Sequence, residues 1–554
     1  MLFRLVASML TTRKRKVLLS CIGLLILIVA AWQFYKYRLI DKKIGEVTEK
    51  THGLYSIRYE NLTLDEASGT LHIRNIEVTP DTAVFNRMMQ ENKAPSVLIH
   101  ASIPALDVFG VKTPKALLTK QIEGRSISIT DPTIEILLNH FGKDTTIHNP
   151  SRDLSQELLS KLSKISIDSV QLIHSNVTVR DMEEKEAAFT GSDVSVLLSR
   201  FDLDSLAVKD SSRVLFARDA RVHCSALQLP SKNKKYRLQI ERLTYTSRED
   251  ALSVGQFRLI PRLSETAFAA SYPVSKDRYD FFLENIRLLH ISRSGLWHKR
   301  IEADSLVIGR SSFKIYRDLS YPHDTISKVG KYPQQQLMRL PVELSIRQVV
   351  FNRSFIEYKE KNARSDSAGK MQFTDVTATI RNVTNRREAI ARNNRCLLLF
   401  KAKLLDKSPV DAQLVMLLHD PKGRFTIKGT IGPIDAPSLN PLTRPMGLAK
   451  MEKGQVDRLH FDLKGTDSAA EGSLTMLYQD VRISLLKKDR KEEKLNKKAL
   501  PTLAANLFMR HSNLEKGGSP RMVEVHFDRI LNKSFFNLIW KSIFSGIKQT
   551  VGMK

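Results

Sequence analysis

The sequence has few cysteines and lacks the short motifs that mark common enzymes. Only three cysteines occur among its 554 residues, Cys21, Cys224 and Cys396. So few thiols exclude a disulfide framework and give no support to a cysteine-bound metal, and a single Cys224–Cys396 disulfide is the one pairing left open. No P-loop, Gly-x-Ser-x-Gly, His-Glu-x-x-His or Cys-x-x-Cys motif is present. We therefore expect no catalytic residue, no cofactor and no metal site.

Negative charge is scarce relative to positive charge. The chain has 87 Lys and Arg against 59 Asp and Glu, which gives a net charge of +28. The basic residues are spread along the whole chain, and no nucleic-acid-binding module is recognisable. An anionic membrane surface therefore explains the charge better than nucleic acid does, and we expect no nucleic-acid partner.

Long apolar runs are also rare, and the first one is the most informative segment of the chain. Arg13-Lys14-Arg15-Lys16 precedes a run that begins at Val17 and is long enough to cross about 30 Å of hydrocarbon as a helix. Trp32 and Tyr35 suit the far membrane interface. We predict a single-pass anchor in a bacterial inner membrane, with the bulk of the chain in the periplasm. A signal peptide cleaved near Val29-Ala30-Ala31 is the alternative.

Beyond this run, apolar and polar residues alternate with the period of half-buried β-strands. The phase of the alternation slips across Asn61 and Asn75, on either side of a Ser68-Gly69 turn. These slips predict a hairpin with bulges that bend the sheet. In the last third the alternation is regular, and turns expected at Gly454 and at Gln479-Asp480 would divide it into a meander of antiparallel strands.

Helices are expected to be few. Short ones are predicted at 81–90, 113–119 and 151–162, and a longer amphipathic helix at 534–551. On this last helix Phe536, Trp540, Ile543 and Phe544 are candidates for a membrane interface. Docking of the helix on the protein core, or into an apolar groove, is left open.

Several segments resemble the AsmA-like family of bacterial envelope proteins. They are YSIRYENLTLDEASGTLHIRNIEVTPD (55–81), ISITDPTIEI (127–136), LSIRQVVFNRSFIEY (344–358) and, most specifically, the segment from Phe425 to Lys488 with its Leu439-Asn440-Pro441 turn. The resemblance implies a mostly β fold in which a transmembrane helix precedes an elongated, curved antiparallel β-sheet groove. A few short helices would cap the groove, and an amphipathic helix would end the chain.

The predicted domains follow this scheme. They are a cytoplasmic N-terminus (1–16), a transmembrane helix (17–35), an N-terminal β module (45–185), a middle β-rich region (186–400), an AsmA-like β module (401–488), a charged linker with a final strand (489–533) and the amphipathic helix (534–551).

The resemblance also implies that the groove holds lipid acyl chains and supports phospholipid transfer and outer-membrane homeostasis. The candidate groove residues are the alternating apolar ones: Ile57, Leu71, Ile73, Ile134, Ile136, Phe425, Ile427, Leu459, Phe461, Leu463, Leu474, Met476 and Ile483. The expected partners are phospholipids and the inner membrane. A non-enzymatic assembly factor that contacts outer-membrane or periplasmic proteins through a closed core is the alternative, and an envelope hydrolase is disfavoured because no acid, base or nucleophile cluster is evident.

Overall fold

The computed structural model of the protein describes residues 53–552 except 66, 112–119, 140–162, 184–186, 232, 366, 489–494, 499–500, 502–509 and 514–519. In this part the protein is mostly β, as the alternation predicts. It divides into two compact units: 53–256 with 289–298 form the N-terminal unit, and 257–288 with 299–552 form the C-terminal unit. The helices predicted at 17–35, 113–119 and 151–162 lie outside the described residues.

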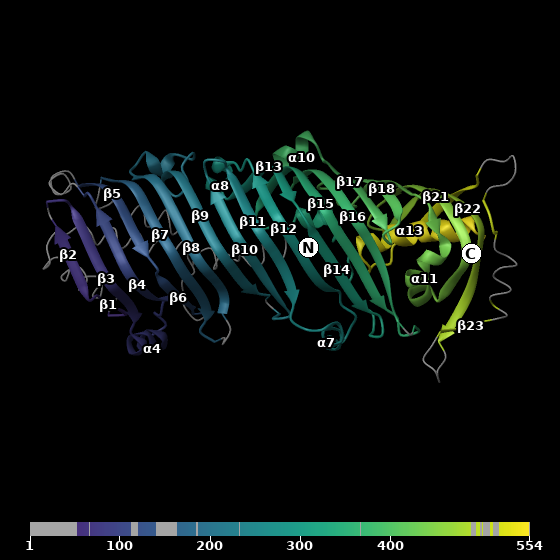
Figure 1. Cartoon of the computed structure of the whole chain (residues 1–554), viewed down its shortest axis with the longest axis horizontal. Helices are drawn as coiled ribbons and strands as arrows, with labels where there is room; N and C mark the ends of the chain where they lie inside the picture. Colours follow the sequence, from purple (N-terminus) through teal and green to yellow (C-terminus); the bar gives the residue numbers. More distant parts are fainter. Residues whose placement is uncertain are drawn as a thin grey trace. The chain divides into compact units, whose positions relative to one another are not determined.

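The N-terminal unit is a sheet whose strands are neighbours in chain order (Figure 1). β1 and β2 lie end to end along β3, β5 and β6 lie end to end along β4, and β7 to β10 pair antiparallel in succession. The elements are β1 (Tyr55–Arg58), β2 (Asn61–Asp65), β3 (Thr70–Pro80), α4 (Thr82–Gln90), β4 (Val97–Phe109), β5 (Gln121–Thr130), β6 (Thr133–Leu138), β7 (Lys164–Asp181), β8 (Ala187–Leu203), η1 (Ala207–Lys209), β9 (Ala217–Pro230), β10 (Tyr236–Thr246), the start of β11 (Ala251–Pro261) and α8 (Arg293–Trp297).

The C-terminal unit is built in the same way. β12 pairs with β14, and β15 to β19, β21, β22 and β24 pair antiparallel in that order. The elements are the end of β11, α7 (Glu265–Ala270), β12 (Arg278–Leu289), β13 (Arg300–Ile308), β14 (Ser311–Asp318), α9 (Pro333–Leu337), β15 (Glu343–Lys361), β16 (Ala368–Thr384), α10 (Arg387–Arg392), β17 (Arg395–Leu404), β18 (Ser408–Leu417), β19 (Phe425–Ile431), β20 (Ile434–Asp435), η2 (Ala436–Leu439), α11 (Asn440–Gly447), β21 (Ala449–Gly465), β22 (Ala469–Lys488), β23 (Leu495–Lys497), β24 (Met522–Asp528) and α13 (Phe535–Thr550).

The pairing is not antiparallel throughout, so that part of the predicted fold class needs correction. β5 and β6 pair with β7 in parallel, and β13 and β14 pair with β15 in parallel. Parallel neighbours need a crossover connection of about a dozen residues or more. Residues 139–163 and 319–342 are the connections that lead into β7 and β15 at these two junctions.

The two parallel junctions are copies of one arrangement. Gln121 pairs with Lys164 at the first junction, and Arg300 pairs with Glu343 at the second. Each residue of the second pair lies 179 residues after its counterpart in the first pair. The long strands also match in sequence, ISIDSVQLIHSNV at 165–177 and LSIRQVVFNRSFI at 344–356. His174 and Arg353, at equivalent positions, both have positive φ. Each unit therefore contains the same structural repeat.

Bulges, rather than turns, interrupt the long strands. The register shifts near His174 in β7 and near Arg353 in β15; Asn75 in β3 has a positive φ, but the pairing of β3 with β4 keeps one register across it. The turns predicted at Gly454 and Asp480 are wrong, because both residues lie inside the continuous strands β21 and β22. Gly454 has φ of +124°, and a Cβ added to it would lie 2.5 Å from Val481 Cα. The glycine therefore allows the close approach of β21 and β22 where the register between them shifts.

Capping hydrogen bonds explain where two of the predicted helices begin. Asp81 caps α4 by accepting hydrogen bonds from the backbone N–H groups of Ala83 and Val84. Ser534 caps α13 in the same way, through Asn537 N–H. Both helices therefore start at the polar residue from which the sequence predicts them.

The repeat yields a matched pair of serine variants as a test. Ser354 Oγ lies 2.6 Å from Ser311 Oγ in the interior, whereas the equivalent Ser175 faces Pro132 and its buried Oγ has no hydrogen-bond partner. We expect Ser354→Ala to destabilise the chain by about 1–3 kcal/mol, because it leaves the buried Ser311 hydroxyl without a hydrogen-bond partner. We expect Ser175→Ala to be neutral or stabilising, because the Ser175 hydroxyl has no partner to lose. Urea denaturation of the full chain measures both, and equal losses would contradict the assignment.

Candidate functional site

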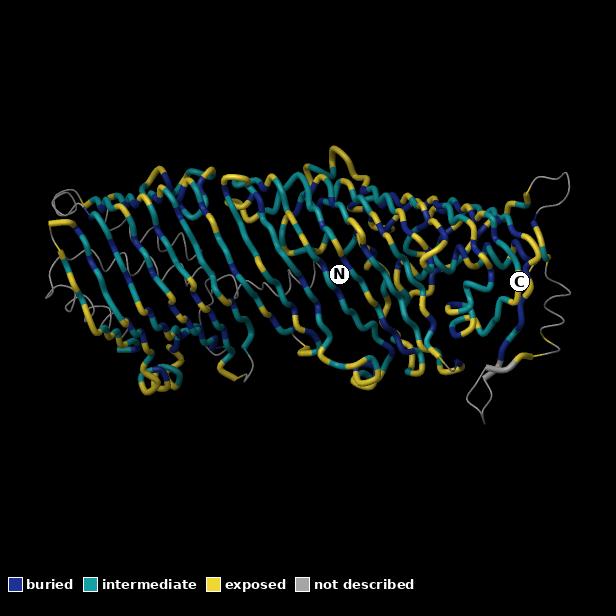
Figure 2. The backbone as a smooth tube through the Cα atoms, viewed as in Figure 1, coloured by how far each residue is buried: buried dark blue, intermediate teal, exposed yellow. Residues whose placement is uncertain are grey.

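Apolar side chains form continuous rows that cross the strands of the N-terminal unit. Along one face, each strand contributes one apolar residue in register with the next, and on strands such as β6 buried positions recur at every second residue (Figure 2). One row is Leu62, Ile73, Leu106, Ile129, Leu172, Val196, Val222 and Tyr245; a second is Leu64, Leu71, Val108, Ile127, Val170, Leu198 and Ala220. These rows run perpendicular to the strands, so the apolar surface is continuous across the unit.

The C-terminal unit has two equivalent rows. They are Leu306, Val349, Ile380, Leu398, Leu414, Ile427 and Leu463, and Ile308, Phe351, Ala378, Phe400, Ala412, Gly429, Phe461 and Leu474. The second row combines large and small residues, which alternate from Phe351 to Ala412. An added Cβ at Gly429 would lie 2.4 Å from the Phe461 ring, so the glycine leaves room for that ring.

All the candidate groove residues lie on these apolar faces. The structure brings Ile57, Leu71, Ile73, Ile134 and Ile136 together in the N-terminal unit. It gathers the rest in the C-terminal unit: Phe425, Ile427, Leu459, Phe461, Leu463, Leu474, Met476 and Ile483. On the strands that carry these candidates, the alternation in the sequence therefore identifies the apolar face.

Helix α13 covers the last part of the C-terminal face. Phe535, Leu538 and Ile539 are buried in the same cluster as the β19 to β24 residues, and Gly546 lies against Leu474 and Val525. Of the alternatives that the sequence leaves open for this helix, the structure shows docking on the apolar face. The candidate groove residues beneath α13 are thus inside a closed core, whereas some row residues of other strands, such as Phe351 and Phe400, are only partly buried.

The docking of α13 buries one of its membrane-interface candidates and leaves the others exposed or half-buried. Ile543 is only 6% exposed and belongs to the core, whereas Phe536 is 65% and Phe544 40% exposed. Trp540 is half-buried and stacks on Phe544 at 6.1 Å between ring centroids. Trp32 and Tyr35 lie outside the described residues. An exposed aromatic stripe therefore remains on α13 opposite its docked side.

The opposite face of the C-terminal sheet carries ion pairs between strands. Lys428 Nζ lies 2.8 Å from Asp462, and Lys464 Nζ lies 3.2 Å from Glu471. These lysine side chains are 62% and 70% exposed, so each pair contributes at most about 1 kcal/mol. The alternation thus separates an apolar face from a charged, solvated one.

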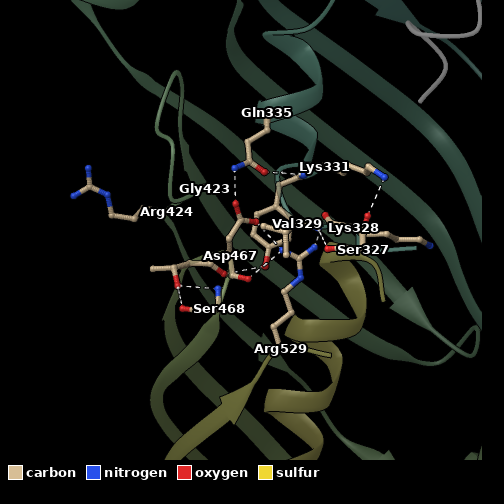
Figure 3. A network of polar contacts seen from close by, with 12 residues as sticks. Ser327, Lys328, Val329, Lys331, Gln335, Gly423, Arg424, Asp467, Ser468 and Arg529 are labelled. Atoms are coloured by element: carbon tan, nitrogen blue, oxygen red, sulfur yellow. Dashed lines mark hydrogen bonds and ion pairs between the residues drawn. The ribbon is translucent and has the colours of Figure 1, made fainter. Parts of the chain in front are cut away.

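A buried polar network holds α13 and the second crossover in place (Figure 3). Arg529, just after β24, has its Nη1 atom 2.7 Å from Asp467 Oδ1, and its Nη2 atom donates to the carbonyl of Lys328 at 2.6 Å. The guanidinium also lies 4.3 Å from the ring centroid of Tyr332. Gln335, on α9, donates to the other oxygen of Asp467 at 2.7 Å. The network joins the turn between β21 and β22, the β24–α13 connection and the crossover 319–342.

Tyr332 is the aromatic centre of this junction. Its ring is fully buried, 4.7 Å from that of Phe535 and 6.1 Å from that of Phe425, and its hydroxyl donates to Thr466 O at 2.9 Å. Burial raises the pKa of Tyr332 to about 12. Sequence analysis missed Tyr332 and Arg529, because neither belongs to a periodic segment and their partners are distant in the chain.

The structure offers neither a metal site nor a membrane span within its described ranges. No three His, Cys, Asp or Glu side chains gather there as a metal ion would require. No described helix is both long and apolar enough to cross a bilayer. The predicted anchor at 17–35 lies outside these ranges.

We expect Arg529 to be essential for the docking of α13. Arg529→Met leaves Asp467, which is only 12% exposed, without its cation, and such a loss costs about 3–5 kcal/mol. Lys464→Met, which removes one lysine from an exposed pair, should cost less than about 1 kcal/mol. Hydrogen exchange of the peptides covering 327–332 and α13 measures the difference, and unchanged protection in the Arg529 variant would contradict the assigned role.

The two described thiols are free and buried, so no disulfide joins Cys224 and Cys396. Burial raises the pKa of Cys396 from 9.0 to about 11 and also raises that of Cys224. Since the folded value of Cys396 is the higher one, this thiol stabilises the fold below pH 9, and its contribution is lost as the pH rises through about 11.

The reactive species of a cysteine is the thiolate. We therefore expect Cys224 and Cys396 to resist iodoacetamide at neutral pH in the native chain and to react after unfolding in urea. Peptide mass spectrometry follows each thiol separately. Rapid native labelling of either one would show that its strand opens easily.

No protein-family model matches the chain, and a search of curated proteins finds no match.

Proposed function

We propose that this protein is a membrane-anchored envelope protein of the AsmA-like type, which binds lipid acyl chains along its apolar rows and supports phospholipid transfer and outer-membrane homeostasis. The observation that carries the proposal is the continuity of the rows, from Leu62 to Tyr245 in one unit and from Leu306 to Leu463 in the other.

The physical argument rests on how an acyl chain would contact such a row. Shielding a methylene group from water is worth about 0.8 kcal/mol, so an acyl chain gains several kcal/mol along a row. Neighbouring strands are about 4.8 Å apart, and each supplies a similar apolar side chain. A chain that slides from one strand to the next exchanges equivalent contacts, so movement needs no chemical step.

Helix α13 sets a limit on the proposed path in the C-terminal unit. The rows beneath it, around Phe461 and Leu474, are filled by Phe535, Leu538 and Ile539. Acyl chains would therefore contact the strands before β19, where Phe351 and Phe400 are only partly buried.

Some residues of the same apolar cluster as the rows are deeply buried, and this favours a second function, that of an assembly factor with a closed core. Ile136 and Leu203 in the N-terminal unit are 0% exposed. A protein-binding scaffold would use its charged outer face and keep the apolar face dry.

Photocrosslinking in cells that express the full chain separates the two proposals. A photoreactive residue replaces one partly buried row residue at a time: Leu172, Val196, Phe351 or Phe400. Phe461 and Met476 report on the face beneath α13, and the outward Lys428 and Lys464 are controls.

We expect phospholipid adducts at the four partly buried positions, fewer beneath α13 and none at the two lysines, because only the first set offers accessible apolar surface. Mass spectrometry identifies the adducts. Adducts to protein alone, or equal lipid labelling at the lysines, would overturn lipid binding on the rows and favour the assembly factor.

A further inference from the structure

The crossover 319–342 and the β24–α13 connection together hold several basic residues in fixed positions. Lys328 N–H donates to Leu531 O at 2.7 Å, and Asn532 Nδ2 donates to Asp324 O at 2.7 Å. Lys533 follows directly in the chain. The two lysines are thus carried by segments that are hydrogen-bonded to each other, although they are distant in sequence.

Neither lysine has an acidic partner. Among the described residues, no carboxylate lies within ion-pair distance of Lys328 or Lys533, and the nearest polar contact of Lys533 Nζ is His323 Nδ1 at 3.4 Å. Burial lowers the pKa of both lysines and the charge of Arg317 lowers it further, while the carboxylates of Asp277, Asp324 and Glu360 offset part of this shift. Each ammonium is therefore partly desolvated and repelled by its basic neighbours.

The acids of this region are already engaged. Asp277 lies 3.3 Å from Arg317 Nη1, and Asp324 lies 2.5 Å from Lys276 Nζ. Glu360 accepts a hydrogen bond from the Tyr358 hydroxyl at 2.6 Å. Only 7% of the surface of Arg317 is exposed, and its Nε makes no hydrogen bond. We call Arg317, Lys328 and Lys533 the cationic cluster; Arg317 is paired with Asp277, whereas the two lysines have no carboxylate within ion-pair distance among the described residues.

The cationic cluster lies at the end of the apolar face. Phe313, Ile315 and Arg317 alternate along β14, so they share one side of the strand. Phe313 packs edge-on against Phe281 and Phe351, at 5.4 and 6.0 Å between ring centroids. The apolar face thus leads directly to a buried guanidinium.

Exposed apolar side chains flank the same lysines. Ile326 and Val329 of the crossover are 60% and 43% exposed, and Ile530 and Leu531 of the β24–α13 connection are 44% and 56% exposed. Large apolar side chains gathered at the surface usually mark a binding site. Apolar surface beside unpaired cations matches an amphipathic anion, with a phosphate at one end and acyl chains at the other.

We propose that the cationic cluster binds the phosphate of a phospholipid headgroup while the acyl chains of that lipid lie on the Phe313–Phe351 part of the apolar face. This inference rests on the proposed function, because it requires acyl chains on that face. It adds the headgroup chemistry: a phosphate is needed at this position, and a neutral lipid of the same chain length binds less tightly.

The test measures binding to the full chain in a maltoside detergent by calorimetry. The probes are a short-chain phosphatidylglycerol, a diacylglycerol with the same acyl chains and inorganic phosphate. The variant is Lys328→Met with Lys533→Met, and Lys541→Met is the matched control, since Lys541 lies over the Phe544 ring on α13 and outside the cluster. Loss of two desolvated charges should leave the melting temperature unchanged or raise it.

We expect the double variant to bind phosphatidylglycerol at least about tenfold more weakly, with unchanged affinity for diacylglycerol, and the control to bind both as the native chain does. Unchanged phosphatidylglycerol binding in the double variant would overturn the headgroup site and leave the proposed function intact. Inorganic phosphate that binds as tightly as the lipid would make this a free-anion site instead. No binding of either lipid to the native chain would overturn the proposed function itself.

Discussion

The central constraint on this structure is strand register. A row of apolar side chains crosses many strands only if every strand keeps its phase, because a slip of one residue moves each side chain to the opposite face. The rows through Leu172 and Phe351 cross their units without a break despite the bulges in β7 and β15. The register shifts of β7 and β15 begin after Leu172 and Phe351, so they leave the row residues in phase.

The C-terminal apolar face is bordered differently at α13 and at β14. Helix α13 fills the face over β19 to β24, and Arg529 and Asp467 fix that helix to the second crossover. At β14 the face ends in Arg317, whose ion pair with Asp277 leaves Nε without a partner. The part of the face under α13 is therefore closed by hydrophobic packing, and the part at β14 ends in positive charge. A lipid that lies on this face would have a defined position for its headgroup.

Local signals in the sequence account for the parts of the fold that local chemistry controls. Alternation places the candidate apolar residues together on the apolar faces, and Asp81 and Ser534 predict the starts of two helices. Gly454 and Asp480 were misassigned to turns, since a positive-φ residue fits a bulge as well as a turn. The parallel junctions, the docking of α13 and the cationic cluster depend on contacts between distant residues, and no local pattern specifies them.

The most direct test of the central claim is native mass spectrometry of the full chain released from detergent. Continuous, accessible apolar rows predict that the chain retains phospholipid, and that Phe351→Asp with Phe400→Asp reduces the number of bound lipids because a carboxylate cannot face an acyl chain without a large desolvation cost. Lys428→Asp with Lys464→Asp, on the outer face, should leave that number unchanged. A native chain without bound lipid, or equal losses in both double variants, would contradict the account.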